Sequence, residues 1–320
     1  MTGCVTRRVW PLIRICVAAV FLVALFRVID FTAAVEVLAE LDVGTILLVI
    51  ALFGAGQVLS SLRWRLALLQ IMPAPPSLPA LLRLYLVGMF VNLGIPTMAG
   101  GDLVRAEFLR RAVGARGGAY ASIVVDRLIG VLAVTMVAAV AALAAGDIVE
   151  ADTKTAVLKA AVALAVGMAG AAFVLRQLNG GLWERLDPFL SAIKTIARRP
   201  GVLSICLAIA VAVQTLAVIL PISLLAKAMG IDVALSSHFV LVPIIILITL
   251  LPISPNGLGL RETAFVVLYG QFGILAEQAF ALGFAWSLVL TAFGLLGGAL
   301  LFISGADIVP GRKRHKGPVG

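Results

Sequence analysis

Long apolar runs, separated by short charged segments, constrain the fold of this chain more than any other feature of its sequence. The run at 43–62 contains no Asp, Glu, Lys or Arg, and about 20 such residues in a helix cross the hydrocarbon core of a bilayer. Charged residues make up 13% of the chain, whereas roughly 25% is usual in a globular protein. The chain therefore has too few polar side chains to cover a water-soluble surface. We predict an all-α polytopic membrane protein that forms a single membrane domain over residues 1–320.

Six of the runs are long enough to cross the membrane as full helices. The first, at 10–29, follows Arg7 and Arg8. A cleaved signal peptide is the alternative there, but no small-residue cleavage site ends the run and further spans follow, so we interpret it as an uncleaved helix. The other five runs lie at 43–62, 119–145, 155–175, 202–226 and 278–306.

Two further apolar segments, at 84–101 and 239–260, are interrupted by proline and glycine. If each enters the membrane and returns, both termini and the basic clusters stay in the cytoplasm, as the positive-inside rule requires. The alternative of eight plain spans forces a charged segment through lipid, which is costly. We therefore predict about six full transmembrane helices plus two re-entrant broken-helix hairpins. The expected location is the inner membrane, with the N-terminus and the basic tail at 307–320 in the cytoplasm.

The two interrupted segments share the pattern Pro-x4-Gly-x3-Arg at an offset of 156 residues (252 − 96). The pattern consists of Pro96, Gly101 and Arg105 in the first segment and of Pro252, Gly257 and Arg261 in the second. The same offset carries the span at 119–145 onto 275–301, which overlaps the last predicted span. One hairpin enters from the cytoplasm and the other from outside, as in inverted-topology repeats. We predict one repeat over about 10–146 and a second over about 155–306.

The broken segments also predict a binding site. Proline and glycine free backbone groups that lipid cannot satisfy, so these segments must be buried in protein or line a wet cavity. Arg105 and Arg261 follow the two breaks at equivalent positions, and arginine binds phosphate through paired hydrogen bonds. Helix N-termini at the breaks add positive dipole ends. The candidate substrate-binding residues are Asn92, Gly101, Asp102, Arg105, Asp126, Arg127, Asn256, Gly257, Arg261 and Glu262.

Several of these polar residues also have simpler interpretations. Arg105 is alternatively an anchor at the membrane interface, and Asp126 with Arg127 an interfacial salt bridge. Arg63, like other basic residues beside the spans, is most simply a positive-inside anchor, and Trp64 a member of an aromatic belt.

No nucleotide, nucleophile or metal motif accompanies this pattern. The sequence contains no GxxxxGK[ST] loop, GxSxG elbow or HExxH helix, which argues against an ATP-driven motor and gives no sign of a familiar nucleophile. The three cysteines lie far apart and the two histidines are isolated, so we expect no metal and no other cofactor. The formal charge of +9 is spread in clusters that act as topology signals, which argues against nucleic-acid binding.

Several motifs, in this order, resemble the membrane region of the lysylphosphatidylglycerol synthases. They are Arg63-Trp64-Arg65, Gly100-Gly101-Asp102-x-x-Arg105, Ser122-x-x-x-Asp126-Arg127-x-x-Gly130 and Pro252-x-Ser254-x-x-Gly257-x-Gly259-x-Arg261-Glu262. The resemblance covers roughly residues 10 to 305, and stand-alone members are called flippase-like. It implies a fold that moves modified lipid between leaflets, while a separate cytosolic domain of the two-domain synthases performs aminoacylation. The chain ends soon after its last predicted span, so we expect no such domain and infer no lysyl transfer.

These observations favour an ATP-independent, flippase-like membrane transporter of an anionic or modified (phospho)lipid. They favour a transporter over an enzyme. The alternative is an integral-membrane glycosyltransferase, or its accessory protein, acting on polyprenyl-phosphate-linked sugars, with Asp102 and Glu107 near Arg105 as its carboxylates. A third interpretation is a scaffold for a separate cytosolic synthase or transferase. A homo-oligomer is compatible with each.

Overall fold

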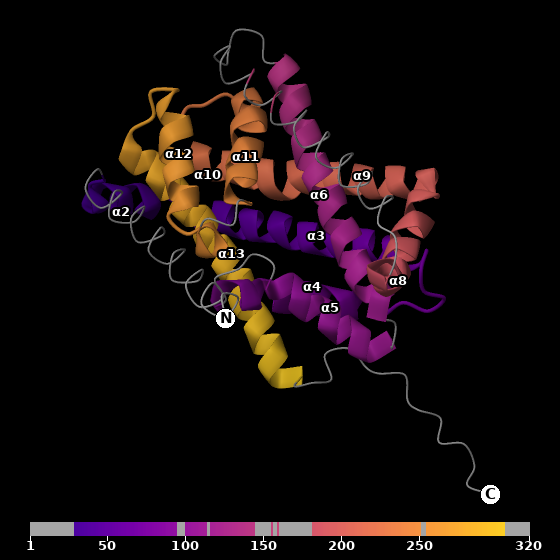
Figure 1. Ribbon diagram of the computed structural model, residues 1–320. Coiled ribbons are helices and arrows are strands. Elements are labelled where there is room, and N and C mark those ends of the chain that lie inside the picture. Colours follow the sequence, from indigo (N-terminus) through magenta and orange to yellow (C-terminus); the bar gives the residue numbers. More distant parts are fainter. Residues whose placement is uncertain are drawn as a thin grey trace, which may run out of the picture.

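The computed structural model describes residues 29–94, 100–113, 116–144, 181–250 and 254–304, together with Thr155 and Lys159 (Figure 1). Every element in these residues is a helix. The predicted spans at 10–29 and 155–175 and the basic tail at 307–320 lie outside them, except for a few single residues. Pro96 and Pro252, which begin the two predicted motifs, lie outside them as well.

The first half of the chain contributes the described helices up to α6. They are α2 (Phe31–Ala39), α3 (Val43–Leu68), α4 (Leu78–Gly94), α5 (Gly100–Val113) and α6 (Arg116–Ala144).

The second half begins with α8, continues through a long helix with a π-helical segment, and ends with a helix pair and a last long helix. These elements are α8 (Gly181–Ala197), α9 (Pro200–Gln214), η2 (Thr215–Ile219), α10 (Leu220–Ala228), α11 (Leu235–Thr249), η3 (Pro255–Gly257), α12 (Leu260–Gly270) and α13 (Ala276–Ser304).

Among the described residues, four helices are long and apolar enough to cross a membrane, and each matches a predicted span. Large apolar side chains such as Leu47, Val140 and Phe302 are exposed on their outer faces. Such a surface suits lipid and not water. The prediction of an all-α polytopic membrane protein is therefore confirmed. The four helices are Val43–Leu68, Gly118–Ala144, Pro200–Ala228 and Ala276–Ser304.

Local chemistry explains where two of these spans begin and why one of them widens. The Asp42 carboxylate accepts a hydrogen bond from the backbone N–H of Thr45, at 2.9 Å, and so caps α3. Pro200 occupies the first turn of α9, where its missing N–H leaves no bond unmade. Pro221, further along, cannot donate to the preceding turn, and the π-helical segment η2 lies directly before it. The wider turn relieves the clash of the proline ring.

Two helix pairs interrupt this set of long helices, at the places where the sequence predicts hairpins. The first pair is α4 with α5, and the second is α11 with α12; the partners are in contact in each. The first pair differs from the prediction at its boundaries, because α4 begins at Leu78 and the charged segment after the break forms α5. A long helix follows each pair, α6 the first and α13 the second (Figure 1).

The helix bounds repeat at nearly the predicted offset. The helices α3 and α4 begin at Val43 and Leu78, and their counterparts α9 and α11 begin at Pro200 and Leu235, so both pairs are separated by the same length of chain. The separation of α6 from α13 is only slightly longer. The internal repeat itself, and the opposite orientation of its two copies in a bilayer, stay predictions.

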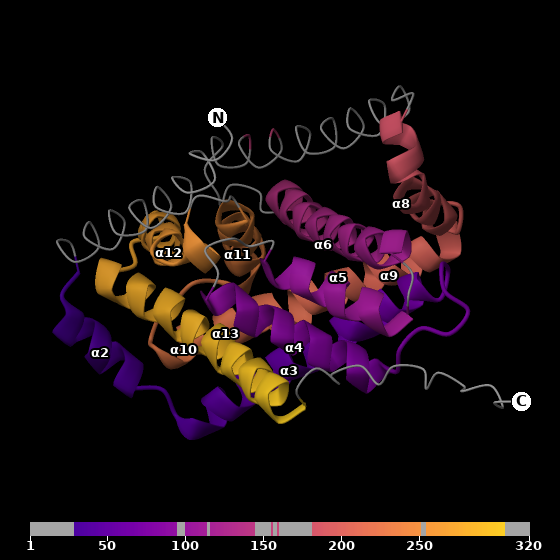
Figure 2. The ribbon, with the colours of Figure 1, turned by 60° about the horizontal axis from the view of Figure 1, so that its bottom comes forward.

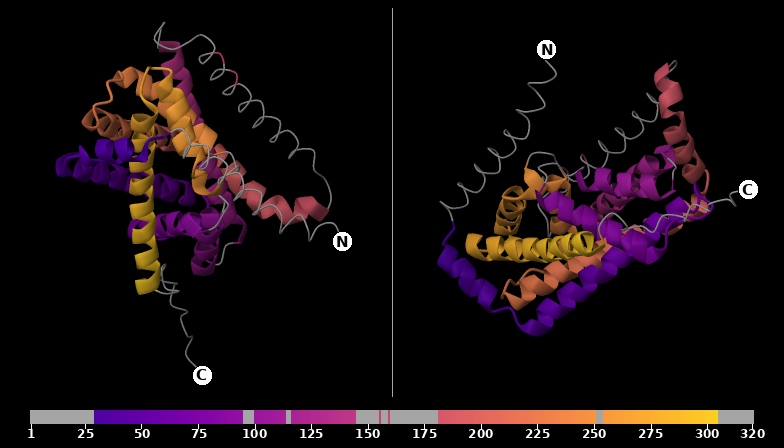
Figure 3. Two further views of the ribbon diagram at one scale, coloured as in Figure 1. Left: turned by 90° about the vertical axis from the view of Figure 1, so that its left-hand side faces the viewer. Right: turned by 90° about the horizontal axis from the view of Figure 1, so that it is seen from below.

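Close contacts between helices join the two halves of the chain. The helices α4 and α13 lie side by side (Figure 2), and glycines on α13 allow their backbones to touch. A Cβ atom added at Gly297 would lie 1.9 Å from the carbonyl oxygen of Leu86. Likewise, α3 runs along α9, η2 and α10 (Figure 3), where a Cβ on Gly56 would lie 2.2 Å from that of Ala217. Small residues of this kind let membrane helices approach closely.

Candidate functional site

A polar cavity of about 260 Å³ lies where the two hairpins meet, and residues of α3, α6 and α13 complete its wall. It receives Arg105 from the first hairpin and Arg261 from the second. The remaining lining residues are Gln57, Tyr85, Gly88, Met89, Asn92, Leu93, Asp102, Arg127, Asn256 and Leu290.

Six of the ten predicted site residues line this cavity, and the other four support its walls. The lining residues are Asn92, Asp102, Arg105, Arg127, Asn256 and Arg261. Gly101, Asp126, Gly257 and Glu262 do not line it. Their contacts, described below, show that these four position the residues that do.

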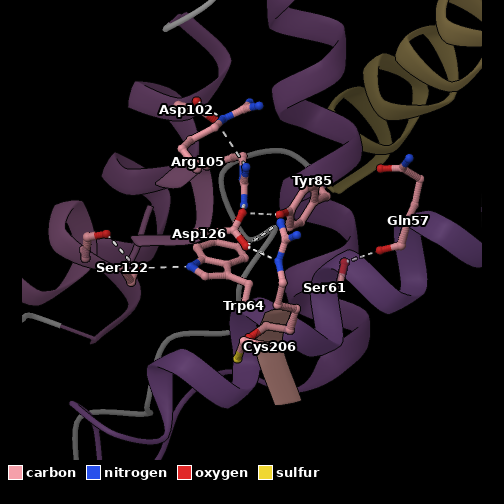
Figure 4. Close-up of polar contacts among 12 residues, drawn as sticks. Gln57, Ser61, Trp64, Tyr85, Asp102, Arg105, Ser122, Asp126 and Cys206 are labelled. Atoms are coloured by element: carbon pink, nitrogen blue, oxygen red, sulfur yellow. Dashed lines mark hydrogen bonds and ion pairs between the residues drawn. The ribbon is translucent and has the colours of Figure 1, made fainter. Parts of the chain in front are cut away.

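Arg105 is the most enclosed cation of the site. It extends from the second turn of α5, and its side chain is only 2% exposed. Its Cζ atom lies 3.6 Å from the ring centre of Tyr85 and 4.4 Å from that of Trp64, a cation–π arrangement that favours a buried guanidinium. Figure 4 shows Arg105 between Asp102 and Asp126. The interpretation of Arg105 as an interfacial anchor is therefore wrong.

Asp126 is the buried counter-ion behind Arg105. The carboxylate accepts hydrogen bonds from the Arg63 Nε atom, at 2.9 Å, and from the Tyr85 hydroxyl, and Arg63 Nη2 lies 2.8 Å away. The distance from Arg105 Nη2 to the same carboxylate is 3.6 Å. A carboxylate buried at 3% exposure needs such partners, because desolvation of an unpaired charge is costly.

Asp102 binds Arg127 of α6 as well as Arg105. Its carboxylate accepts two hydrogen bonds from Arg127, at 2.5 and 2.8 Å, and one from Arg105 Nη1, at 3.1 Å. The prediction that Asp126 and Arg127 form a salt bridge with one another is thus wrong. They are adjacent on α6, so their side chains point in different directions, and Arg127 binds Asp102 while Asp126 binds Arg63.

Asn92 and Gly101 close the first hairpin. The Asn92 side-chain oxygen accepts a hydrogen bond from the Gly101 N–H, at 2.8 Å, and so satisfies a free donor in the first turn of α5. A Cβ on Gly101 would lie 2.1 Å from the carbonyl oxygen of Gly88. Gly101 is therefore required for close packing of α5 on α4 and does not itself face the cavity.

Arg261 reaches the cavity from α12 and is held by neutral groups. It donates from Nη1 to the Ser287 hydroxyl and from Nη2 to the Asn256 carbonyl oxygen, both at 2.9 Å. Asn256 adopts a positive φ of 50°, a conformation that asparagine tolerates better than most residues. That turn aims the Asn256 carbonyl at the guanidinium.

Glu262 supports this arrangement from behind. Its carboxylate accepts hydrogen bonds from the Gly259 N–H, at 2.8 Å, and from the Ser287 hydroxyl, at 2.6 Å. The first contact is the glutamate half of a capping box at the start of α12, because Gly259 has no side chain to supply the other half. Gly257 has a φ of 75° and lies in the same turn. Both residues shape the second hairpin, and neither contributes an atom to the cavity wall.

Of three comparisons with known proteins, one found a match. A family model described as the lysylphosphatidylglycerol synthase TM region matches residues 12–298. The chain belongs to this family. No curated protein and no solved structure matches it.

In this member of the lysylphosphatidylglycerol synthase TM family, sequence reasoning misassigns or misses several residues around the site. The sequence pattern assigns Arg63 and Trp64 to the membrane interface, yet both are buried, and Trp64 donates its indole N–H to Ser122 at 3.1 Å. For Tyr85 and Ser287 the pattern predicts no role at all. Arg63, Trp64 and Ser122 all lie in the motifs that carry the family resemblance. Those motifs are the sequence signal by which these three residues could have been assigned to the site.

The charges of the cavity in this family member favour an anion. Three arginines and one carboxylate, Asp102, line it. Arg105 Nε is buried and has no hydrogen-bond partner, and Nη2 has only the ion-pair contact with Asp126 at 3.6 Å. Phosphate oxygens match the fork of a guanidinium.

Proposed function

We propose that this protein moves a lipid with an anionic or modified phosphate headgroup between the leaflets of a membrane, without nucleotide hydrolysis. One observation carries the proposal. Arg105 and Arg261, from two hairpins half a chain apart, line the same polar cavity in a protein whose outer surface is apolar.

The size and chemistry of the cavity support a headgroup as its occupant. A volume of about 260 Å³ equals the liquid volume of roughly eight or nine water molecules, which suits a headgroup and leaves no room for acyl chains. Arg105, Arg127 and Arg261 line the cavity, and the first turn of α5 adds a positive dipole end. A phosphate that moves from water onto these groups enters a site of similar polarity, while the acyl chains of the lipid stay in the bilayer.

The setting of the protein is part of the same proposal. We place it in the inner membrane with both termini in the cytoplasm, and its hairpins in inverted-topology repeats. A separate cytosolic synthase or transferase would then supply the lipid from the cytoplasmic side. A homo-oligomer is compatible with this arrangement.

A reconstitution assay tests the transport function. The full chain is placed in liposomes that carry fluorescent phosphatidic acid or phosphatidylglycerol, and the rate of transbilayer movement is compared with that in empty vesicles. We expect clear acceleration by the wild type and a loss of about tenfold or more in Arg105→Gln and in Arg261→Gln, because each removes a charge-assisted contact worth about 1.5–3 kcal/mol.

Arg111→Gln is the matched control for this assay. Arg111 lies on α5, as Arg105 does, but its side chain is 65% exposed and binds Glu107 away from the cavity. Its loss should leave the transport rate within about twofold of wild type. Equal rates in protein-containing and empty vesicles for both lipids would contradict the proposed function.

The glycosyltransferase alternative receives less support from the site. It needs a carboxylate free to act beside the phosphate. Glu107 does not line the cavity and instead binds Arg110 and Arg111. Asp102 does line it, but both of its oxygens accept hydrogen bonds from Arg127.

A further inference from the structure

Asp102 binds the guanidinium groups of Arg105 and Arg127, which a phosphate in the cavity would also bind. It is the one acidic residue among the described residues that line the cavity, and its carboxylate binds Arg127 through both oxygens and Arg105 through one. Its side chain is 16% exposed, compared with 3% for Asp126. Asp102 therefore faces the cavity, whereas Asp126 is enclosed by protein.

The contact between Asp102 and Arg105 is incomplete. Asp102 engages only Nη1 of Arg105, while Nη2 lies 3.6 Å from the buried Asp126 carboxylate. A carboxylate has two oxygens, both of which already bind Arg127. A phosphate group offers more acceptor oxygens than a carboxylate, so in the place of Asp102 it can accept hydrogen bonds from Arg105 Nη1 and from Arg127 on separate oxygens.

We propose that Asp102 is an internal competitor of the substrate: its carboxylate holds Arg105 and Arg127 until the phosphate of a lipid headgroup displaces it. This inference rests on the proposed function. The returning carboxylate then speeds release of the phosphate, so that a headgroup bound by several cations is not retained in the cavity.

A purely structural salt bridge predicts the opposite effect of mutation. If Asp102 serves only to hold Arg105 and Arg127 in place, its removal disorders them and weakens phosphate binding. If Asp102 competes with phosphate, its removal frees two cations and strengthens binding. The sign of the change in affinity therefore separates the two roles.

The test is calorimetric titration of short-chain phosphatidic acid into the full chain, held in nanodiscs of uncharged phosphatidylcholine. We expect Asp102→Asn to bind this probe about tenfold more tightly than wild type. Arg261→Gln, which removes a cation on the opposite hairpin, should bind at least tenfold more weakly. Glu107→Gln removes the same charge from α5 outside the cavity and should change the affinity less than twofold.

Each outcome of this titration decides a question. If Arg261→Gln weakens binding but Asp102→Asn binds no more tightly than wild type, the competitor role is overturned and the proposed function stands. If neither wild type nor Asp102→Asn binds the probe, both proposals fall. Asp102→Ser serves as a second variant. If both substitutions abolish the folded protein, as judged by its melting temperature, Asp102 is a structural brace and the competitor role is overturned.

Discussion

At the scale of single residues, the charged side chains around the cavity form two groups, one in the protein interior and one at the cavity. Asp126 and Arg63 bind each other in the protein interior, where their side chains are 3% and 9% exposed. Asp102 and Arg127 bind at the cavity, with Arg127 half exposed. Arg105 touches both carboxylates and stacks on two aromatic rings. It thus connects the interior pair to the cavity pair.

The interior pair should be strongly coupled in stability. Asp126→Asn leaves Arg63 buried without a counter-ion and leaves Arg105 with Asp102 alone, so we expect a loss of about 3–5 kcal/mol of stability, seen as a large fall in melting temperature. The double variant Asp126→Asn with Arg63→Gln should recover part of the loss. The measurement is a double-mutant cycle on purified protein in detergent.

Glu107→Gln is the comparison for this cycle, because Glu107 binds Arg110 and Arg111 nearer the surface. Its melting temperature should fall much less than that of Asp126→Asn. Strictly additive effects of Asp126→Asn and Arg63→Gln would show that the pair is not coupled.

Sequence reasoning locates the cavity arginines but misassigns the interior pair, for a physical reason. Arg105 and Arg261 follow proline and glycine breaks, and such backbone cannot face lipid. Arg63 ends an apolar run beside Arg65, where a basic residue most simply marks a membrane boundary. Its partner Asp126 is 63 residues away, and no local pattern reports a contact over that separation.

At the scale of the helix, glycine decides how closely the two halves approach. The glycines of α13 lie against α4, and a Cβ at Gly297 would clash with the backbone of Leu86 and Val87. Helices in a membrane gain little from the hydrophobic effect on association and depend on such close packing.

Gly297→Ala should therefore separate α4 from α13. Any added side chain meets a backbone carbonyl at 1.9 Å, which no rotamer change relieves, so we expect a loss of roughly 1–3 kcal/mol and a lower melting temperature. Gly201→Ala is the matched control, since a Cβ there meets nothing within 4 Å. It should leave stability unchanged or slightly raised, because alanine favours a helix. Equal melting temperatures of the two variants would contradict this account of the helix contact.

The existence of the helices was predictable, whereas some of their boundaries were not. The long apolar runs predict each described span, because an apolar segment in lipid must satisfy its own backbone groups as a helix. The charged segment 100–113 carries no apolar run, and its helix α5 is held by contacts with α4 and α6. The π-helical turn before Pro221 was not predicted either. It packs against α3.

At the scale of the whole molecule, the proposed inversion of the two halves makes a prediction about sidedness. Ala74, before α4, and Ala234, before α11, are both exposed in loops that lead into the two hairpins. If the hairpins enter from opposite sides, single cysteines at these positions are reached by a membrane-impermeant thiol reagent from opposite sides.

This experiment uses a background in which Cys4, Cys16 and Cys206 are replaced by serine. In intact cells, Ala234→Cys should be labelled and Ala74→Cys protected. In inverted membrane vesicles the pattern should reverse. Labelling of both positions from one side would refute the inversion while leaving the described helices unchanged.

The backbone contact between α4 and α13 has a mechanical consequence for the whole protein. The first of these helices belongs to one half of the chain and the second ends the other half, so this contact joins the halves backbone to backbone, as the contact of α3 with η2 does at Gly56. A tight contact of this kind does not stretch gradually, because packed helices shift between discrete arrangements. If the proposed transport moves the two halves relative to one another, we expect the motion to occur away from these glycine contacts.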